Sequence, residues 1–337
     1  YGDPLLESQV LSEAASVDGF SLRPHACIEK CNRALKLVSG NINTLFFSNA
    51  LTYFTLCLIT TGDATGAKPY VAALLEHAKR LQSPIQIQSG LFSQSLTEYL
   101  EGDYDRAREH ADIAIEKAPN NARSRRLALV IESETGNFDK ADEHLDSLNN
   151  LDARNYSSQT YLASYIAGLA TAMRIRGDLG NLELALRAAD EFRLLPVAVP
   201  QFELYIAVSM ALIASMTDDA ELAGMQSHNL MKHKGSIANW LTVSVDRALG
   251  LVCHTVGDYS GGQTQFEDAL TFCRNAGYRT ELAWTLHDYA DMLLERDGPG
   301  DQQNATTMLD EALQISTDLG MRPLMERVLS KRDILEA

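Results

Sequence analysis

A triplet of residue types recurs along this chain at a fixed offset, and that recurrence restricts the fold more than any other feature of the sequence. In the segment 91–121 a glycine, an aromatic residue and an alanine separate two stretches with helical periodicity, and the same types return 34 residues later. The triplets are Gly102, Tyr104 and Ala107, followed by Gly136, Phe138 and Ala141. Glycine can adopt the positive φ that ends a helix, and alanine lets paired helices approach each other closely. Each segment is therefore predicted to form a hairpin of two helices.

Turn positions of this kind extend over the whole chain, at intervals of 34 to 41 residues from Gly62 onward. They are Gly19, Gly62, Gly102, Gly136, Gly177, Thr217, Gly257 and Gly298. The segment 243–276 repeats the full signature, whereas the pair around Thr217 departs from it, with Leu222 where a small residue is expected. No stretch keeps the alternation of period two that marks a strand. We expect residues 1–337 to form one all-α repeat domain, a solenoid of about seven helical hairpins without a sheet.

These residues resemble the tetratricopeptide repeat family, and the segments 88–121 and 243–276 carry the most specific part of that resemblance. The longer period and the ending ATTMLDEALQISTDLGMRPLMERVL are further similar to the repeat domains of large bacterial LuxR-type, ATP-dependent transcription regulators. The resemblance implies a right-handed α-α superhelix whose first helices line a concave groove for peptides, helices or neighbouring domains. Those regulators carry a nucleotide-binding module before the repeats and often a helix-turn-helix after them. Because the chain starts at Tyr1 without an initiator methionine or signal sequence, we expect it to be a fragment of a longer polypeptide.

The resemblance also implies which side chains face the groove, because the family makes its contacts from fixed positions of each first helix. Carried over to this sequence, those positions include Phe92, Tyr99, Arg123, Arg126, Arg174, Arg247, His254, Trp284, His287 and Asp291. Arginines recur among them although the chain has a formal charge of -16. We therefore expect the groove to receive an acidic or carboxylate-bearing ligand, with the three aromatic residues of that set as anchors. The alternative is that Arg123, Arg125 and Arg126 are only solvated charges on the surface of one helix.

Charge and composition limit the other classes of function. With 45% hydrophobic and 22% charged residues, the chain has enough apolar surface to fold. Its negative charge repels nucleic-acid phosphates and anionic lipids, so we expect neither to bind directly. The longest apolar runs, 51–59 and 204–216, are shorter than the roughly 20 residues that span a bilayer, and no membrane span is predicted. Five scattered cysteines are an odd number that does not suggest a disulfide framework, which favours a cytoplasmic protein.

Three segments imitate catalytic or metal-binding motifs, and each has a simpler explanation. The segment 62–69, GDATGAKP, lacks the spacing of a phosphate loop, because three residues separate its glycines and alanine precedes its lysine. Cys27 and Cys31 share a helix face but find no second pair with metal-ligand spacing. His287 with Asp288 is a single pair that is too small to fill a coordination sphere. We therefore predict no catalytic residue, no metal site and no cofactor.

The leading functional interpretation is a non-enzymatic interaction and sensor module of a bacterial signalling regulator. In that role the binding of a protein or peptide in the groove is transmitted to attached domains, and a small-molecule inducer is a second kind of ligand. A long solenoid suits the role because small shifts between repeats add up along the array. Two alternatives remain open: a stand-alone scaffold that bridges protein partners, and a homo-oligomer that associates through the apolar face of a terminal helix.

Overall fold

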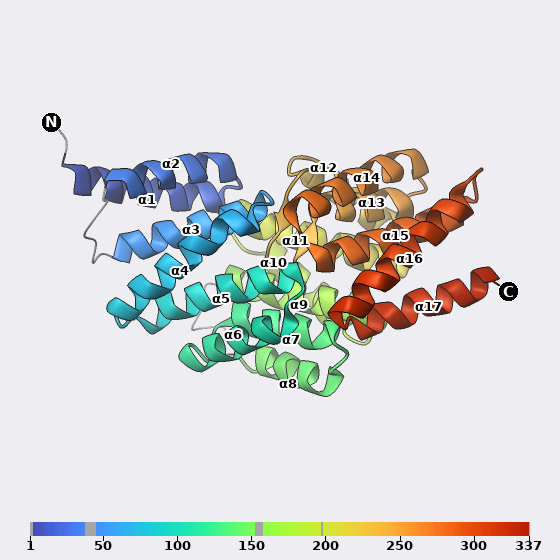
Figure 1. The fold of residues 1–337 in the computed structure, drawn as a ribbon, viewed down its shortest axis with the longest axis horizontal. Helices are drawn as coiled ribbons and strands as arrows, with labels where there is room; N and C mark the ends of the chain where they lie inside the picture. Colours follow the sequence, from blue (N-terminus) through green and yellow to red (C-terminus); the bar gives the residue numbers. More distant parts are fainter. Residues whose placement is uncertain (1–2, 38–44, 152–157, 197, 337) are drawn as a thin grey trace.

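The computed structural model describes residues 3–37, 45–151, 158–196 and 198–336, which contain seventeen helices and two very short strands (Figure 1). The elements are α1 (Pro4–Phe20), α2 (Pro24–Leu37), α3 (Leu45–Thr60), α4 (Ala64–Arg80), α5 (Pro84–Glu101), α6 (Tyr104–Lys117), α7 (Ala122–Glu134), α8 (Phe138–Asn149), α9 (Ser158–Arg176), α10 (Leu182–Arg193), α11 (Pro200–Thr217), α12 (Ala220–Met231), β1 (Ile237–Ala238), β2 (Val243–Ser244), α13 (Val245–Thr255), α14 (Tyr259–Ala276), α15 (Arg279–Arg296), α16 (Asp301–Leu319) and α17 (Arg322–Glu336).

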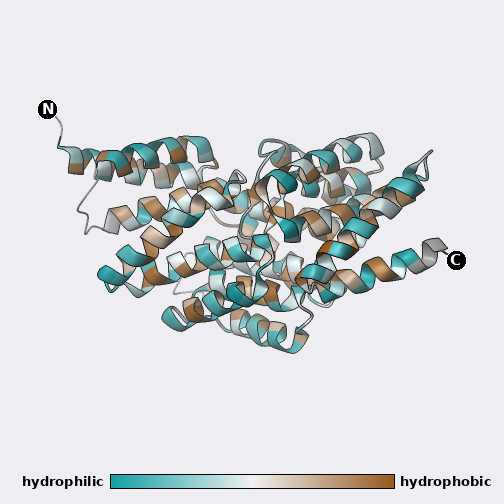
Figure 2. Cartoon of the chain, viewed as in Figure 1, coloured by the Kyte–Doolittle hydropathy of each residue, from teal (hydrophilic) through white to brown (hydrophobic). Residues whose placement is uncertain are grey.

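Consecutive helices pack as antiparallel hairpins, so that α1 to α16 form eight pairs and α17 follows as a single helix packed on α16. The all-α repeat fold predicted from the sequence is confirmed, although it has one hairpin and one helix more than the seven pairs expected. In Figure 2 hydrophilic residues dominate the visible faces of the outer helices α2 and α16, and the helices between them carry more hydrophobic residues. Among the described residues, none of the helices combines the length and the apolar character needed to cross a bilayer.

Glycines at the turns serve both the hairpin and the packing between distant repeats. Gly102 ends α5 with a φ of 92° and Gly136 follows α7 with a φ of 72°. A Cβ at Gly102 would lie 2.5 Å from the Leu319 side chain, and one at Gly136 would lie 2.5 Å from Arg322. These turns therefore need glycine for the left-handed backbone, and the side-chain ends of Leu319 and Arg322 lie close against them.

The turn at Thr217 shows how the repeat tolerates a different residue. Thr217 is the last residue of α11, and Asp218 takes the left-handed conformation with a φ of 51°. Aspartate adopts this conformation at lower cost than most residues. Leu222 is only partly buried, and the wholly buried Ala223 supplies the small residue one position later.

The array closes on itself, because helices late in the chain pack against the first helices of early hairpins. Helix α15 contacts α5, and α17 contacts α7 and α9. Tyr278 donates a hydrogen bond of 2.6 Å to the carbonyl of Ile59, and Thr280 donates one of 2.8 Å to the carbonyl of Tyr99. Much of the inner face, which the odd-numbered helices form, is therefore covered by the chain itself.

The connection between α12 and α13 departs from the helical pattern and was not expected from the sequence. Strands β1 and β2 pair antiparallel, with Ile237 opposite Ser244 and Ala238 opposite Val243. We call residues 237–244 the plug segment, because all of them are buried. A buried segment outside a helix must pair its backbone polar groups, and the short ladder does part of this.

Candidate ligand-binding site on the inner face

A pocket of about 270 Å³ opens on the inner face, and we call it the inner pocket. Its walls come from the first helices of four successive hairpins, α9, α11, α13 and α15, together with Asp218, which directly follows α11. The lining residues are Arg174, Ser215, Asp218, Leu251, His254, Thr255, Asp288, Asp291 and Glu295. The repeat architecture places them together, because each first helix contributes one exposed stripe to the same face.

Helix α15 supplies the carboxylates of the inner pocket. Asp288, Asp291 and Glu295 stand three and four residues apart, a spacing that aligns side chains on one face of a helix. Their burial decreases along the helix, since Asp288 is 1% exposed, Asp291 is half-buried and Glu295 is exposed. The pocket therefore runs from a dry floor at Asp288 to a solvated rim at Glu295.

A buried ion network forms the floor. Arg247 donates a hydrogen bond of 2.9 Å to Asp288, Arg174 pairs with the other oxygen of the same carboxylate, and His287 Nδ1 lies 3.0 Å from it. Burial alone would raise the pKa of Asp288, but Arg174, His287 and Arg247 together hold that pKa well below its ordinary value. Asp288 is therefore a fixed anion that orients two arginines.

The rim of the inner pocket is richer in carboxylates than in cations. His254 Nε2 lies 2.9 Å from Glu295, which also accepts a hydrogen bond of 2.9 Å from Tyr259. Lys331 of α17 pairs with Asp291 at 2.6 Å. Over the described residues, no group of three or more histidine, cysteine, aspartate or glutamate side chains could hold a metal ion. The lining therefore favours a ligand group that donates hydrogen bonds, such as an amine, a guanidinium or an amide.

Three of the ten residues predicted from the sequence line this pocket, namely Arg174, His254 and Asp291. The structure buries six others to 3% exposure or less: Phe92, Tyr99, Arg126, Arg247, Trp284 and His287. The tenth, Arg123, is partly buried and lies over the rings of Phe92 and Trp240, at 5.4 and 5.7 Å. Most of the residues predicted for the groove are therefore buried among other parts of the chain, and their role in binding stays a prediction.

Tyr99, Trp284 and Arg247 have partners within the chain instead of facing an open groove. Tyr99 and Trp284 both donate hydrogen bonds to Glu134 on α7, at 3.0 and 2.9 Å. Arg247 pairs with Glu281 and Asp288 of α15. Arg247 and Arg174 therefore pair with carboxylates that the chain itself supplies, and the acidic ligand expected from the sequence stays a prediction.

The alternative that these arginines are only solvated charges on one helix can be compared with the surroundings of Arg125 and Arg126. Arg125 donates a hydrogen bond of 2.8 Å to the carbonyl of Pro119 at the surface. Arg126, one residue later, is wholly buried. Solvation therefore describes Arg125 but not Arg126.

The segments set aside as motifs also find structural roles. Gly62, with a φ of 88°, is the turn between α3 and α4. Cys27 and Cys31 on α2 are joined by Cys57 on α3 in one buried group, and all five cysteines are free thiols. Cys57 was missed because thirty residues of sequence separate it from Cys27, and only the packing of α2 on α3 brings them together.

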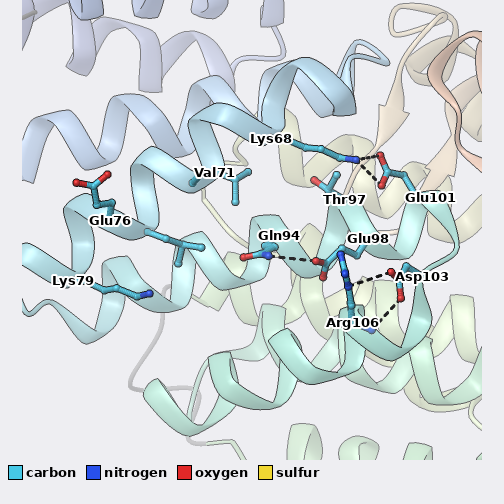
Figure 3. A pocket seen from close by; sticks show the side chains of 12 residues that line it. Lys68, Val71, Glu76, Lys79, Gln94, Thr97, Glu98, Glu101, Asp103 and Arg106 are labelled. Carbon is cyan, nitrogen blue, oxygen red and sulfur yellow. Dashed lines mark hydrogen bonds and ion pairs between the residues drawn. The ribbon is translucent and has the colours of Figure 1, made fainter.

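A larger pocket of about 510 Å³, the outer pocket, lies between α4, α5 and α6 (Figure 3). Val71 and Leu75 contribute an apolar surface. Four of its charged residues form two ion pairs, Lys68 with Glu101 at 2.7 Å and Arg106 with Asp103 at 3.6 Å. We favour the inner pocket as the functional site despite its smaller volume, because four repeats converge on it and three predicted residues line it.

Comparison with known proteins supports the fold. No family model and no curated protein matches the chain. Among solved structures, a Rap protein complexed with competence and sporulation factor superposes with a TM-score of 0.51 at 10% sequence identity. The similarity covers 98% of this chain and 99% of that one. The two proteins therefore share a helical-repeat architecture along their whole length.

Proposed function

We propose that this protein is a recognition module that binds a peptide or protein segment on its inner face, without catalysis. The inner pocket carries the proposal, because first helices of four successive hairpins contribute to one polar cavity. At about 270 Å³ it is slightly smaller than the roughly 300 to 1,000 Å³ typical of pockets for whole small molecules. It therefore suits one or two side chains, or a terminus, of an extended ligand.

The chemistry of the pocket fits binding better than turnover. A catalytic His-Asp pair needs one partner that can reach a substrate, yet His287 and Asp288 are 2% and 1% exposed. Asp288 already meets two arginines and His287. These groups therefore hold the helices of the pocket in place, while Asp218, Asp291 and Glu295 lie nearer the solvent, where their carboxylate oxygens can accept further hydrogen bonds from a donor group of the ligand.

The module is proposed to act as the sensor part of a bacterial signalling regulator of the LuxR type, in the cytoplasm. The similarity to the Rap complex supports a regulatory module, because the factor in that structure is bound to a helical-repeat protein of the same architecture. A stand-alone scaffold is the alternative, and the two differ in whether binding changes the arrangement of the repeats. The closed array favours the sensor, because a ligand that enters between packed repeats must alter their contacts.

The test is a selection of short random displayed peptides on the immobilised protein, followed by affinity measurements with a variant that fills the inner pocket. Thr255→Trp places an indole in the pocket from α13. Thr264→Trp makes the same change at an exposed position of α14 and serves as the matched control. We expect the selected peptides to lose binding to Thr255→Trp and to keep it with Thr264→Trp. Peptides that bind both variants like the wild type would place recognition elsewhere.

A further inference from the structure

The plug segment occupies the centre of the inner face and touches first helices from both halves of the chain. Trp240 stacks on Tyr205 of α11, with ring centroids 5.0 Å apart, and lies under the guanidinium of Arg123 on α7. Asn239 donates a hydrogen bond of 2.8 Å to Thr60 and accepts one of 2.8 Å from Tyr205. Glu281 of α15 accepts a hydrogen bond of 2.6 Å from the backbone N–H of Ser244. The segment thus lies where an extended ligand of a repeat protein would lie.

Two features of the plug segment carry a local energetic cost. Thr242 has a φ of 60°, although a β-branched residue is strongly disfavoured in the left-handed region. The indole N–H of Trp240 is buried and has no acceptor within the described part of the chain. Strained residues of this kind cluster at active sites, ligand clamps and switch regions.

Arg126 lies three residues after Arg123 on α7, and its charge interacts with Tyr205, on which Trp240 stacks. Its guanidinium is wholly buried. None of its three nitrogen atoms has a hydrogen-bond partner among the described residues. Gly168 of α9 packs against its stem, since a Cβ there would lie 3.3 Å from Arg126 Cγ. Ser164 and Thr171, about one turn to either side of Gly168, have buried hydroxyls that likewise find no partner in the described ranges. Arg126 can only donate hydrogen bonds, and the hydroxyls of Ser164 and Thr171 can donate them as well. A hydrogen-bond acceptor could therefore pair with all three side chains.

We propose that a carboxylate of the ligand binds Arg126 when the plug segment moves aside. This inference rests on the proposed function and names the chemical class of one ligand group. A carboxylate is planar and matches the two parallel N–H groups of a guanidinium. It carries one negative charge, which balances the single charge of Arg126, whereas a phosphate would bring excess charge into a buried site. The ligand carboxylate expected from the sequence would thus bind at Arg126. This position is separate from the inner pocket, whose lining favours a hydrogen-bond donor.

The test uses the peptides selected above, resynthesised so that each Asp becomes Asn, each Glu becomes Gln, or the terminal carboxylate becomes an amide. Each series is titrated against wild type and Arg126→Met by fluorescence anisotropy. We expect one neutralisation per series to raise Kd at least about tenfold for wild type and less than about twofold for Arg126→Met. Arg125→Met, on the same helix, is the control and should keep the wild-type loss. Circular dichroism checks the folding of each variant, and Arg126→Lys, which keeps the charge without the fork, replaces Arg126→Met if that variant does not fold.

The outcomes separate this inference from the proposed function. If neutralisation leaves Kd unchanged for wild type, or raises it equally for Arg126→Met, no ligand carboxylate meets Arg126. If no selected peptide responds to Thr255→Trp, the proposed function itself is wrong. Hydrogen exchange gives a second measurement: amides of residues 237–244 should exchange faster when peptide binds, and unchanged or slower exchange would contradict displacement of the plug segment.

Discussion

The guanidinium of Arg247 on α13 donates two hydrogen bonds to the carboxylate of Glu281 on α15, with Nε–Oε1 at 2.7 Å and Nη2–Oε2 at 2.9 Å. Its third nitrogen donates to Asp288, so one arginine joins two carboxylates in the interior. Arg247→Met would leave Glu281 buried without its cation and Asp288 with Arg174 and His287 alone. We expect the free energy of unfolding to fall by about 3 to 5 kcal/mol, measured by urea denaturation. A change below about 1 kcal/mol would mean that water reaches the network.

The same substitution at Arg126 should change the free energy of unfolding in the opposite direction. Burial lowers the pKa of Arg126 to about 10, which reflects a charge without compensating bonds. Arg126→Met removes that charge and keeps most of the side-chain volume, so the free energy of unfolding should rise by about 1 to 3 kcal/mol. Urea denaturation beside Arg125→Met, expected to be near neutral, makes the comparison. A loss of stability would show that Arg126 has partners in solution.

Glu134 predicts a dependence of stability on pH. Burial raises its pKa from 4.5 to about 7, although Trp284 and Tyr99 donate hydrogen bonds that oppose the rise. Between those pH values the folded state holds a proton that the unfolded state has lost, so stability falls as pH increases from about 4.5 to 7. Glu134→Gln should remove this contribution and be more stable than wild type at pH 8, by at most about 3 kcal/mol. Thermal unfolding at several pH values measures the effect, and parallel curves for the two proteins would refute it.

Ala107 tests the packing within a hairpin. Its side chain is wholly buried between α5 and α6, and the carbonyl of Ala107 accepts a hydrogen bond of 2.7 Å from Ser95. Ala107→Leu must force extra volume into this contact, and we expect the free energy of unfolding to fall by about 1 to 3 kcal/mol. Ala220→Leu, at an exposed position of α12, is the control. Equal melting temperatures for the two variants would show that the contact relaxes at no cost.

The repeat could be predicted from the sequence because its determinants are local. Gly102 and Gly136 mark turns by a backbone requirement that acts within a few residues, and the alanines mark contacts within one hairpin. The sequence also showed that the turn at Thr217 departs from the repeat pattern, but it did not show which residues replace the missing glycine and alanine. Asp218 and Ala223 take over the two roles one position later, which depends on how the hairpin settles against its neighbours.

The covering of the inner face could not be predicted in the same way. The bond from Tyr278 to Ile59 joins positions 219 residues apart, and no periodicity relates them. The repeat register predicted that Tyr99 and Trp284 face the groove, and both are buried in the structure. Their shared partner Glu134 lies on α7, and the sequence contains no measure of the superhelical curvature that brings α15 onto α7.

Helix α17 gives the closed array a thermodynamic property that open solenoids lack. Arg322 donates to the carbonyl of Gly136 just beyond α7, and Arg327 donates a hydrogen bond of 2.9 Å to Ile175 in the last turn of α9. Carbonyls at helix C-termini have no partner within their own helix, so these bonds meet a need that each early hairpin leaves open. In a solenoid with contacts between neighbours only, the terminal repeats fray first and stability is a sum of local terms. Here the last helix is hydrogen-bonded to repeats in the middle of the chain. If that helix unfolds, the middle repeats lose these bonds as well. We therefore expect the whole array to unfold in a single cooperative transition.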